Sequence, residues 1–250
     1  MIIRDDRILD PTPRGNRVIW RYLTLEKFLD LILNSELFFT NLTRLTDKYE
    51  GTMYESNYRI AMSAAKKYDN SKEVIEEIIQ EQREINNLRN FTLVNCWTLK
   101  RHESFALWKI YVGNGPGVAI RTTISNLKRS INETKQNFDE DISLAEVKYK
   151  DKLDYSFSRI EATITKKPYY DFENEMRLII FNFPLTDDGY EVPYDLTIGR
   201  KVKINTEILI SSLYISPFIN QNYRQTVFDT IVKLAPFLKS RLKESDINDQ

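Results

Sequence analysis

The chain has 250 residues, of which 42% are hydrophobic and 29% charged, a balance typical of a globular protein with a substantial core. Lysine plus arginine and aspartate plus glutamate each number 36, so the net charge indicates neither a nucleic-acid nor a membrane partner. A local basic patch stays open, because the chain carries three basic pairs: Lys100-Arg101, Lys128-Arg129 and Lys166-Lys167.

The single cysteine, Cys96, and the single histidine, His102, exclude several mechanisms. A zinc site takes about four Cys, His or carboxylate ligands, so we expect no metal. Cys96 lies within an apolar run, where a thiol more often packs than acts as a nucleophile. One cysteine cannot form a disulfide within the chain, which is consistent with a reducing cytosol.

The N-terminus, MIIRDDRILD, has charges directly after two apolar residues and does not have the pattern of a signal peptide. No run of about 18 apolar residues is present, so we expect no membrane association and a cytoplasmic protein. Without repeats or a Pro/Gly/Ser linker, the sequence predicts an arm over 1–17, one domain over 18–243 and a polar tail over 244–250.

Hydrophobic periodicity predicts alternating strands and helices along this domain. We expect strands over 18–22, 37–40, 91–99, 118–122, 142–149, 201–204 and 208–215. We expect helices over 25–34, 54–68, 71–90, 104–112, 124–131, 155–165 and 222–242, the last kinked at Pro236. The glycines of 113–117 indicate a tight turn and not a phosphate loop. The predicted fold class is α+β, a mixed, mostly antiparallel central sheet flanked by helices.

The stretch PYYDFENEMRLIIF, over 168–181, combines charge with a short apolar run that indicates a buried strand. If the strand starts near Phe172, alternation puts Glu173, Glu175 and Arg177 on one face at its mouth. Buried charges are costly unless they are paired or meet a ligand, so this row is a candidate site. The alternative is a structural salt bridge at the rim of the sheet.

Arg21 ends an apolar strand and directly precedes a helix, where its guanidinium could bind a phosphate or carboxylate. Alternatively its stem covers the core, or it pairs with Glu26. Ser104 has the position of a helix N-cap, and the same geometry presents a hydroxyl and backbone N–H groups to a ligand. Trp97, Trp108 and Tyr111 are candidate pocket aromatics, with core packing as the alternative role.

Four segments resemble, in this order, the bacterial domain-of-unknown-function family 2971. They are WRYLTLEKFLDLILNSELFFTN, NLTRLTDKYEG, CWTLKRHESFALWKIYVGNGPGVAIRTT and YYDFENEMRLII. The last three match an Asp-x-x-Glu loop, a central aromatic-rich segment and a late Glu-x-Glu-x-Arg motif. Trp97 replaces the usual phenylalanine, and the resemblance spans about residues 18–181. It implies a bacterial origin and, by itself, no chemistry.

The chain also resembles mono-ADP-ribosyltransferases, which carry an early Arg, a middle Ser, Thr or Tyr, and a late Glu-x-Glu. The matching residues are Arg21, then Thr98 or Ser104, then Glu173 and Glu175. The resemblance implies NAD as substrate and an unknown macromolecular acceptor, as in a toxin or phage-defence effector. In that reading the catalytic residues are Glu175, which stabilises the ribosyl cation, Glu173, which orients or deprotonates the acceptor, and Arg21, which binds the pyrophosphate. The other predicted nucleotide-binding residues are Tyr22, Trp97, Ser104, Trp108, Tyr111 and Arg177.

Two other functions remain open at this point. Paired carboxylates also serve hydrolysis of a nucleotide or glycosidic bond. The Glu-x-Glu-x-Arg row could instead be structural, in a non-enzymatic binding or regulatory module. The oligomeric state is open in each case.

Overall fold

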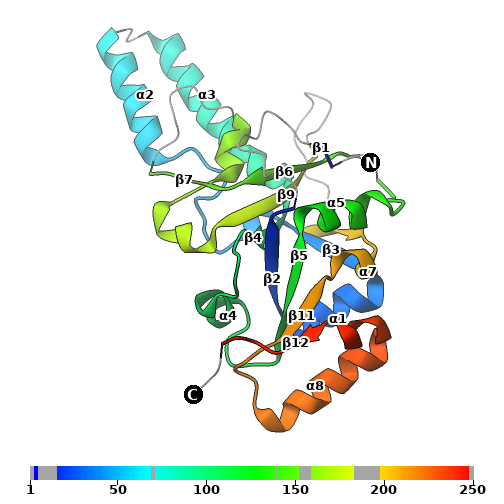
Figure 1. Cartoon of the computed structure of the whole chain (residues 1–250). Helices are drawn as coiled ribbons and strands as arrows, with labels where there is room; N and C mark the ends of the chain where they lie inside the picture. The colour runs from blue at the N-terminus through cyan, green and yellow to red at the C-terminus, as the bar shows by residue number, and fades with distance from the viewer. Residues whose placement is uncertain are drawn as a thin grey trace.

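A mixed, mostly antiparallel sheet forms the centre of the protein, and the predicted α+β class is confirmed (Figure 1). The computed structural model describes residues 3–4, 16–68, 71–138, 140–151, 159–182 and 198–247. Within them a 10-stranded sheet has the order β1-β6-β9-β4-β2-β5-β11-β12, with β3 pairing both β4 and β10. Its strands are β1 (Ile3–Arg4), β2 (Val18–Thr24), β3 (Glu36–Asn41), β4 (Thr92–Thr98), β5 (Gly117–Thr123), β6 (Ile142–Glu146), β9 (Glu175–Phe181), β10 (Gly199–Lys203), β11 (Ser212–Ile215) and β12 (Leu242–Lys243).

Two short strands, β7 and β8, pair in parallel beside this sheet and complete the strands of the described residues. They span Lys148–Tyr149 and Thr165–Lys166. The α-helices are α1 (Leu25–Asn34), α2 (Glu55–Tyr68), α3 (Lys72–Leu88), α4 (Phe105–Tyr111), α5 (Ile124–Asn132), α7 (Thr206–Leu209) and α8 (Gln221–Leu234). The 3-10 helices are η2 (Leu42–Arg44), η3 (Arg89–Phe91), η4 (Arg159–Ile164), η5 (Pro168–Glu173) and η6 (Pro236–Ser240).

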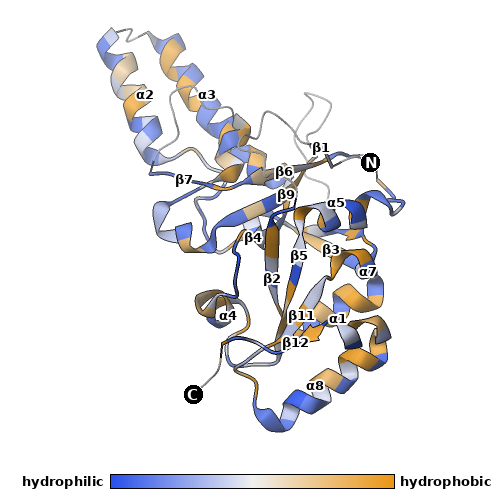
Figure 2. Cartoon of the chain, in the orientation of Figure 1, coloured by the Kyte–Doolittle hydropathy of each residue, from blue (hydrophilic) through white to orange (hydrophobic). Residues whose placement is uncertain are grey.

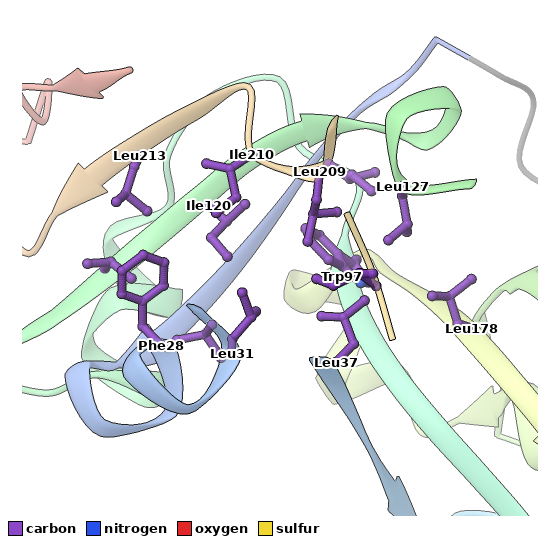
Figure 3. Close-up of a cluster of buried hydrophobic side chains, with 14 of the residues drawn as sticks. Phe28, Leu31, Leu37, Trp97, Ile120, Leu127, Leu178, Leu209, Ile210 and Leu213 are labelled. Atoms are coloured by element: carbon purple, nitrogen blue, oxygen red, sulfur yellow. The ribbon is translucent and has the colours of Figure 1, made fainter. Parts of the chain in front are cut away.

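The main hydrophobic core lies between one face of the sheet and the helices α1, α5, α7 and α8. Figure 3 shows how Phe28 and Leu31 of α1, Leu127 of α5 and Leu209 of α7 approach side chains of the strands. These helices are amphipathic, so each buries one apolar stripe and leaves its polar side in water.

The opposite face of the sheet carries two smaller apolar clusters. One gathers Trp20, Tyr22 and Ala119 around Leu107 and Trp108 of α4. The other joins strand residues such as Val94 and Ile179 to Leu42 of η2 and Ile164 of η4. Because Glu175 and Arg177 alternate with Met176 and Leu178 of the main core, their side chains point to this second face.

Helices α2 and α3 form a hairpin that projects from the sheet (Figure 1). Figure 2 shows polar residues along the outer surfaces of both helices, with apolar residues interspersed. Ala65 is the buried residue of α2 and Ile85 that of α3, and Ile85 packs with Met53 and Ala162 at the base of the hairpin. Ser71 caps α3 by accepting a hydrogen bond from the Val74 N–H.

Strand β4 pairs with two different strands along one of its edges, which leaves a gap in the sheet between them. Leu93 and Val94 pair with Asn41 and Thr40 of β3, whereas β2 meets β4 at the single pair Trp20 and Thr98. Between these points β2 and β3 separate, with α1 connecting them. The separation places one side chain of β2, Arg21, at the opening.

Several predicted elements were wrong in their boundaries. The strand expected from Phe172 begins at Glu175, because η5 starts at Pro168 and ends where Asn174 takes a left-handed φ of 42°. The strand expected over 208–215 is α7 followed by β11, and Pro236 ends α8 rather than kinking it. The predicted helix over 155–165 falls partly outside the described residues, and its described part is η4 followed by Thr165 of β8.

Candidate functional site

A cavity of about 630 Å³ lies at the opening between β2, β3 and β4. Its volume is in the range of small-molecule sites, roughly 300–1,000 Å³. Among its lining residues are most of the predicted site residues, namely Arg21, Tyr22, Trp97, Thr98, Tyr111, Glu173 and Glu175. Side chains that are far apart in the sequence therefore meet in one hollow, since β2, β4 and β9 are neighbours in the sheet.

Arg21 contributes a guanidinium to this cavity. Its Nη1 is buried and has no hydrogen-bond partner within the described residues, and its guanidinium lies 5.8 Å from the centre of the Trp97 ring. Burial lowers the pKa of Arg21 to about 10, so the side chain stays protonated at neutral pH. The alternative pairing with Glu26 is not found; that carboxylate accepts a hydrogen bond from Thr24.

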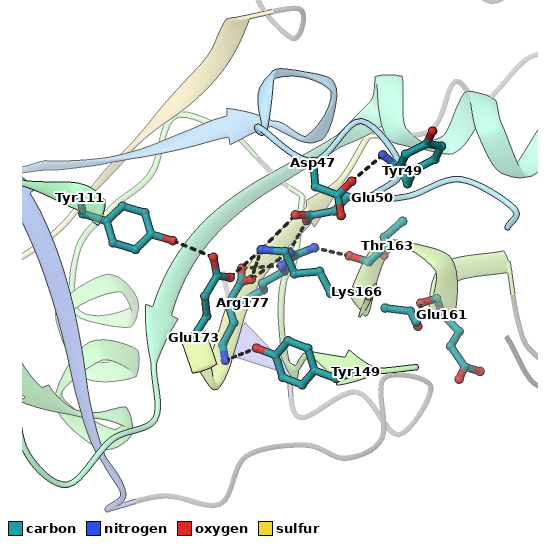
Figure 4. Close-up of polar contacts among 12 residues, drawn as sticks. Asp47, Tyr49, Glu50, Tyr111, Tyr149, Glu161, Thr163, Lys166, Glu173 and Arg177 are labelled. Carbon is teal, nitrogen blue, oxygen red and sulfur yellow. Dashed lines mark hydrogen bonds and ion pairs between the residues drawn. The ribbon is translucent and has the colours of Figure 1, made fainter. Parts of the chain in front are cut away.

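Arg177, by contrast, is fully buried and its hydrogen bonds are satisfied (Figure 4). Its Nε donates to Glu175 at 2.7 Å, and its Nη1 to the carbonyl oxygen of Thr163 at 2.7 Å. Its Nη2 donates to the second oxygen of Glu175 at 3.0 Å and also to Glu50. Arg177 was predicted to bind the nucleotide, but the structure uses it to hold Glu175 in place.

A second cation, Lys166, contacts three carboxylates, two of which also pair with Arg177 (Figure 4). Its Nζ lies 2.6 Å from Glu173, 3.0 Å from Glu50 and 3.2 Å from Glu175. Glu173 also accepts a hydrogen bond of 3.3 Å from the hydroxyl of Tyr111. The five charged groups form one buried network whose three acids and two bases give a formal charge of −1.

Opposing effects set the ionisation of the two predicted catalytic acids. Burial would raise the pKa of Glu175, but Arg177 and Lys166 outweigh burial and lower that pKa to about 2. For Glu173 burial is the larger effect and raises the pKa above its ordinary value, although Lys166 opposes it. Glu175 is thus a permanent anion at neutral pH, whereas Glu173 is the acid closer to taking up a proton.

The sequence did not reveal two members of the network. Glu50 belongs to the Asp-x-x-Glu loop, whose spacing gave no indication that it reaches β9. Lys166 was assigned with Lys167 to a basic surface pair, but its side chain is only 8% exposed and borders the cavity. Lys167 extends away, donating to the carbonyl oxygen of Asp151 and lying over Tyr54, so this pair forms no basic patch.

Three predicted binding residues have structural roles outside the ion network. Ser104 caps α4 by accepting from the Leu107 N–H, and it is not among the cavity residues. Trp108 is fully buried, with its indole N–H donating to Glu103. Tyr22 borders the cavity, but its ring packs on Trp108 and its hydroxyl accepts from the Ser104 N–H.

Of the two candidates for the middle hydroxyl, Thr98 lines the cavity and Ser104 does not. Thr98 is the β4 residue opposite Glu175, and its hydroxyl donates to the backbone carbonyl of Glu173. Cys96, two residues earlier on the same face, also lines the cavity. Burial and the neighbouring Glu175 raise the pKa of its thiol, so it is a poor nucleophile.

Within the described residues, no group of His, Cys and acidic side chains is arranged to hold a metal ion. No described helix is long and apolar enough to cross a bilayer. No family model, no curated protein and no solved structure matches the chain, so the two resemblances drawn from the sequence stay predictions.

Proposed function

We propose that this protein is an ADP-ribosyltransferase-like enzyme that uses NAD as its substrate. The observation that carries the proposal is the meeting of Arg21, Thr98, Glu173 and Glu175 at one cavity of about 630 Å³. An early guanidinium, a middle hydroxyl and a late acid pair are the groups this chemistry needs, and the volume is in the range of small-molecule sites.

Arg21 binds the pyrophosphate in this proposal. A buried guanidinium nitrogen without an acceptor is unfavourable, and a phosphate oxygen would satisfy it with a charge-assisted hydrogen bond. Bound phosphate would also offset the burial that lowers the pKa of Arg21 to about 10. The neighbouring ring of Trp97 supports the flat face of the guanidinium.

The acid network stabilises the reaction at the ribose. When the bond from nicotinamide to ribose breaks, its electron pair leaves with nicotinamide and positive charge develops on the ribose. Glu175, ionised at neutral pH, belongs to a network of formal charge −1 that borders the cavity. The acceptor then forms its bond to the ribose carbon and loses a proton, which Glu173 is placed to accept.

Tyr111 and Tyr170 are the aromatic side chains best suited to pack on the nicotinamide. Both line the cavity, and Tyr111 is 45% exposed, so its ring surface is accessible to a ligand. Trp97 is only 2% exposed and is covered by Arg21, which leaves it the supporting role described above.

Incubation with NAD labelled in its adenylate part tests the proposal directly. We expect nicotinamide release, with label transferred to an acceptor supplied by a bacterial lysate. Glu175→Gln is expected to lower the release by at least about 100-fold, since the carboxylate no longer opposes the developing cation. Absence of both release and transferred label from the purified protein would end the proposal.

A binding or regulatory module is the second candidate, and one observation favours it. Both carboxylate oxygens of Glu175 are already engaged by Arg177, as a structural salt bridge requires. This function predicts that NAD or another nucleotide binds without release of nicotinamide. Release without transferred label would instead favour hydrolysis of the nucleotide.

A further inference from the structure

One ammonium group contacts both acids of the cavity and Glu50 as well. The Nζ of Lys166 lies within 3.2 Å of Glu50, Glu173 and Glu175, and an ammonium has three N–H donors, one for each. The side chain of Lys166 is 8% exposed and that of Glu50 is 2% exposed, so water screens these contacts little. Lys166 therefore couples the three carboxylates electrostatically.

Glu173 differs from the other two acids in how it is compensated. Glu50 and Glu175 each pair with Arg177 as well as with Lys166. In the described ion pairs Glu173 meets Lys166, and its other oxygen accepts from the neutral hydroxyl of Tyr111. A change at Lys166 must therefore alter Glu173 more than it alters the acids that Arg177 also holds.

We propose that Lys166 and Glu50 are positioning residues for Glu173. Together they hold its carboxylate at the cavity and change its proton affinity in opposite directions, so that it can exchange a proton with the acceptor. The inference rests on the proposed function, in which Glu173 accepts the proton of the acceptor. Lys166 favours the ionised form of Glu173 through direct contact. Glu50 disfavours it, because it adds a negative charge and shares the same ammonium.

Charged and titratable groups face Glu173 from each element around it. They are Lys166 of β8, Glu175 of β9, Glu50 of the loop before α2, Tyr111 of α4 and Tyr149 of β7. The two tyrosines stay neutral across the working range, since burial raises the pKa of each. Glu175 stays ionised, which leaves Lys166 and Glu50 as the pair whose removal changes Glu173 in opposite directions.

Titration of the Glu173 side chain by carbon-13 NMR tests the inference without any need for activity. The resonance is assigned by its loss in Glu173→Gln. We expect Lys166→Met to raise the midpoint by about one pH unit or more, and Glu50→Gln to lower it by a smaller amount. Lys166→Arg keeps the cation and should stay near the wild-type midpoint, and Glu50→Gln still tests the inference if Lys166→Met does not fold. Lys167→Met is the matched control, since that lysine extends to Asp151.

The pH dependence of nicotinamide release is the second readout. If Glu173 accepts the proton, the acid limb of the rate should move in the same direction as the midpoint in each variant. Unchanged midpoints, or midpoints that move in one direction in both variants, would overturn the inference even if NAD is consumed. Midpoints that move as expected in a protein that releases no nicotinamide would overturn the proposed function and with it the proton-exchanging role of Glu173.

Discussion

Arg21 lines the cavity and Arg177 holds Glu175 at its border, and the partners of these two arginines differ completely. Arg177 on β9 donates hydrogen bonds to Glu50, Glu175 and the backbone of Thr163. Arg21 on β2 has a buried Nη1 without an acceptor in the described residues. The surroundings reflect this difference, since burial lowers the pKa of Arg21 whereas carboxylates raise that of Arg177 despite its burial.

The contrast separates a structural charge from one that is available to a ligand. A cation that is fully paired within the chain holds other groups in place and has little left to offer a substrate. A cation that is buried without a partner costs free energy, and such a cost is commonly found where a ligand supplies the missing interaction. The two arginines should therefore respond in opposite ways to the same substitution.

Replacing each arginine by methionine gives the largest expected difference. Arg177→Met leaves Glu50 and Glu175 buried with less compensation and should lower the free energy of unfolding by about 3–5 kcal/mol. Arg21→Met removes an unsatisfied donor and should leave that free energy unchanged or slightly higher. Urea denaturation of the three proteins measures both effects. Equal losses in the two variants would show that Arg21 is structural.

Arg21→Met, the variant with the smaller effect on stability, should have the larger effect on NAD binding. Arg21→Met is expected to lower the affinity for NAD by about 10–100-fold, because a charge-assisted hydrogen bond to the pyrophosphate is lost. Arg21→Lys should lose less, since it keeps the charge without the planar fork. Arg121→Met is the control, as Arg121 lies on the adjacent strand and is not among the cavity residues. Calorimetric titration that finds equal affinities for wild type and Arg21→Met would remove Arg21 from the site.

The pH dependence of the free energy of unfolding distinguishes Glu173 from Glu175. The pKa of Glu175 is about 2 in the folded protein against an ordinary value of 4.5, so its contribution is complete above pH 4.5 and is lost as the pH falls toward 2. The pKa of Glu173 is raised, so its ionisation lowers stability as the pH rises from 4.5 through the folded value. Unfolding followed at several pH values should show a shallower acid loss in Glu175→Gln and not in Glu173→Gln.

The sequence predicted the fold class and the strands β4 and β9 because these depend on local pattern. Alternation along 175–181 identified β9 and put Glu175 and Arg177 on one face, and the apolar run of 91–99 identified β4. Glu173 was placed on the strand as well, although Asn174 breaks the extended backbone before Glu175. Asparagine tolerates the left-handed region better than most residues, but apolar alternation does not show that Asn174 adopts it.

Glu50 and Lys166 were beyond such reasoning for a different physical reason. Their positions depend on packing between segments that are distant in the chain, 127 residues apart in the case of Glu50 and Arg177. Two adjacent lysines are typical of an exposed segment. Only the three-dimensional arrangement shows that carboxylates enclose Lys166. The same arrangement removed Arg177 from the predicted binding set, since its donors are used within the protein.

Reactivity of Cys96 gives the smallest expected effect and tests whether a ligand bound at Arg21 reaches the part of the cavity that Cys96 lines. Cys96 and Arg21 line the same cavity, and the raised thiol pKa predicts slow alkylation by iodoacetamide at pH 8. Saturating NAD should slow this reaction further by about 2–10-fold, because a ligand anchored at Arg21 occupies the approach to the thiol. The protection should vanish in Arg21→Met at the same NAD concentration and persist in Arg121→Met. If NAD binds but leaves the alkylation rate of the wild-type protein unchanged, the ligand lies elsewhere, and the unpaired nitrogen of Arg21 is not its anchor.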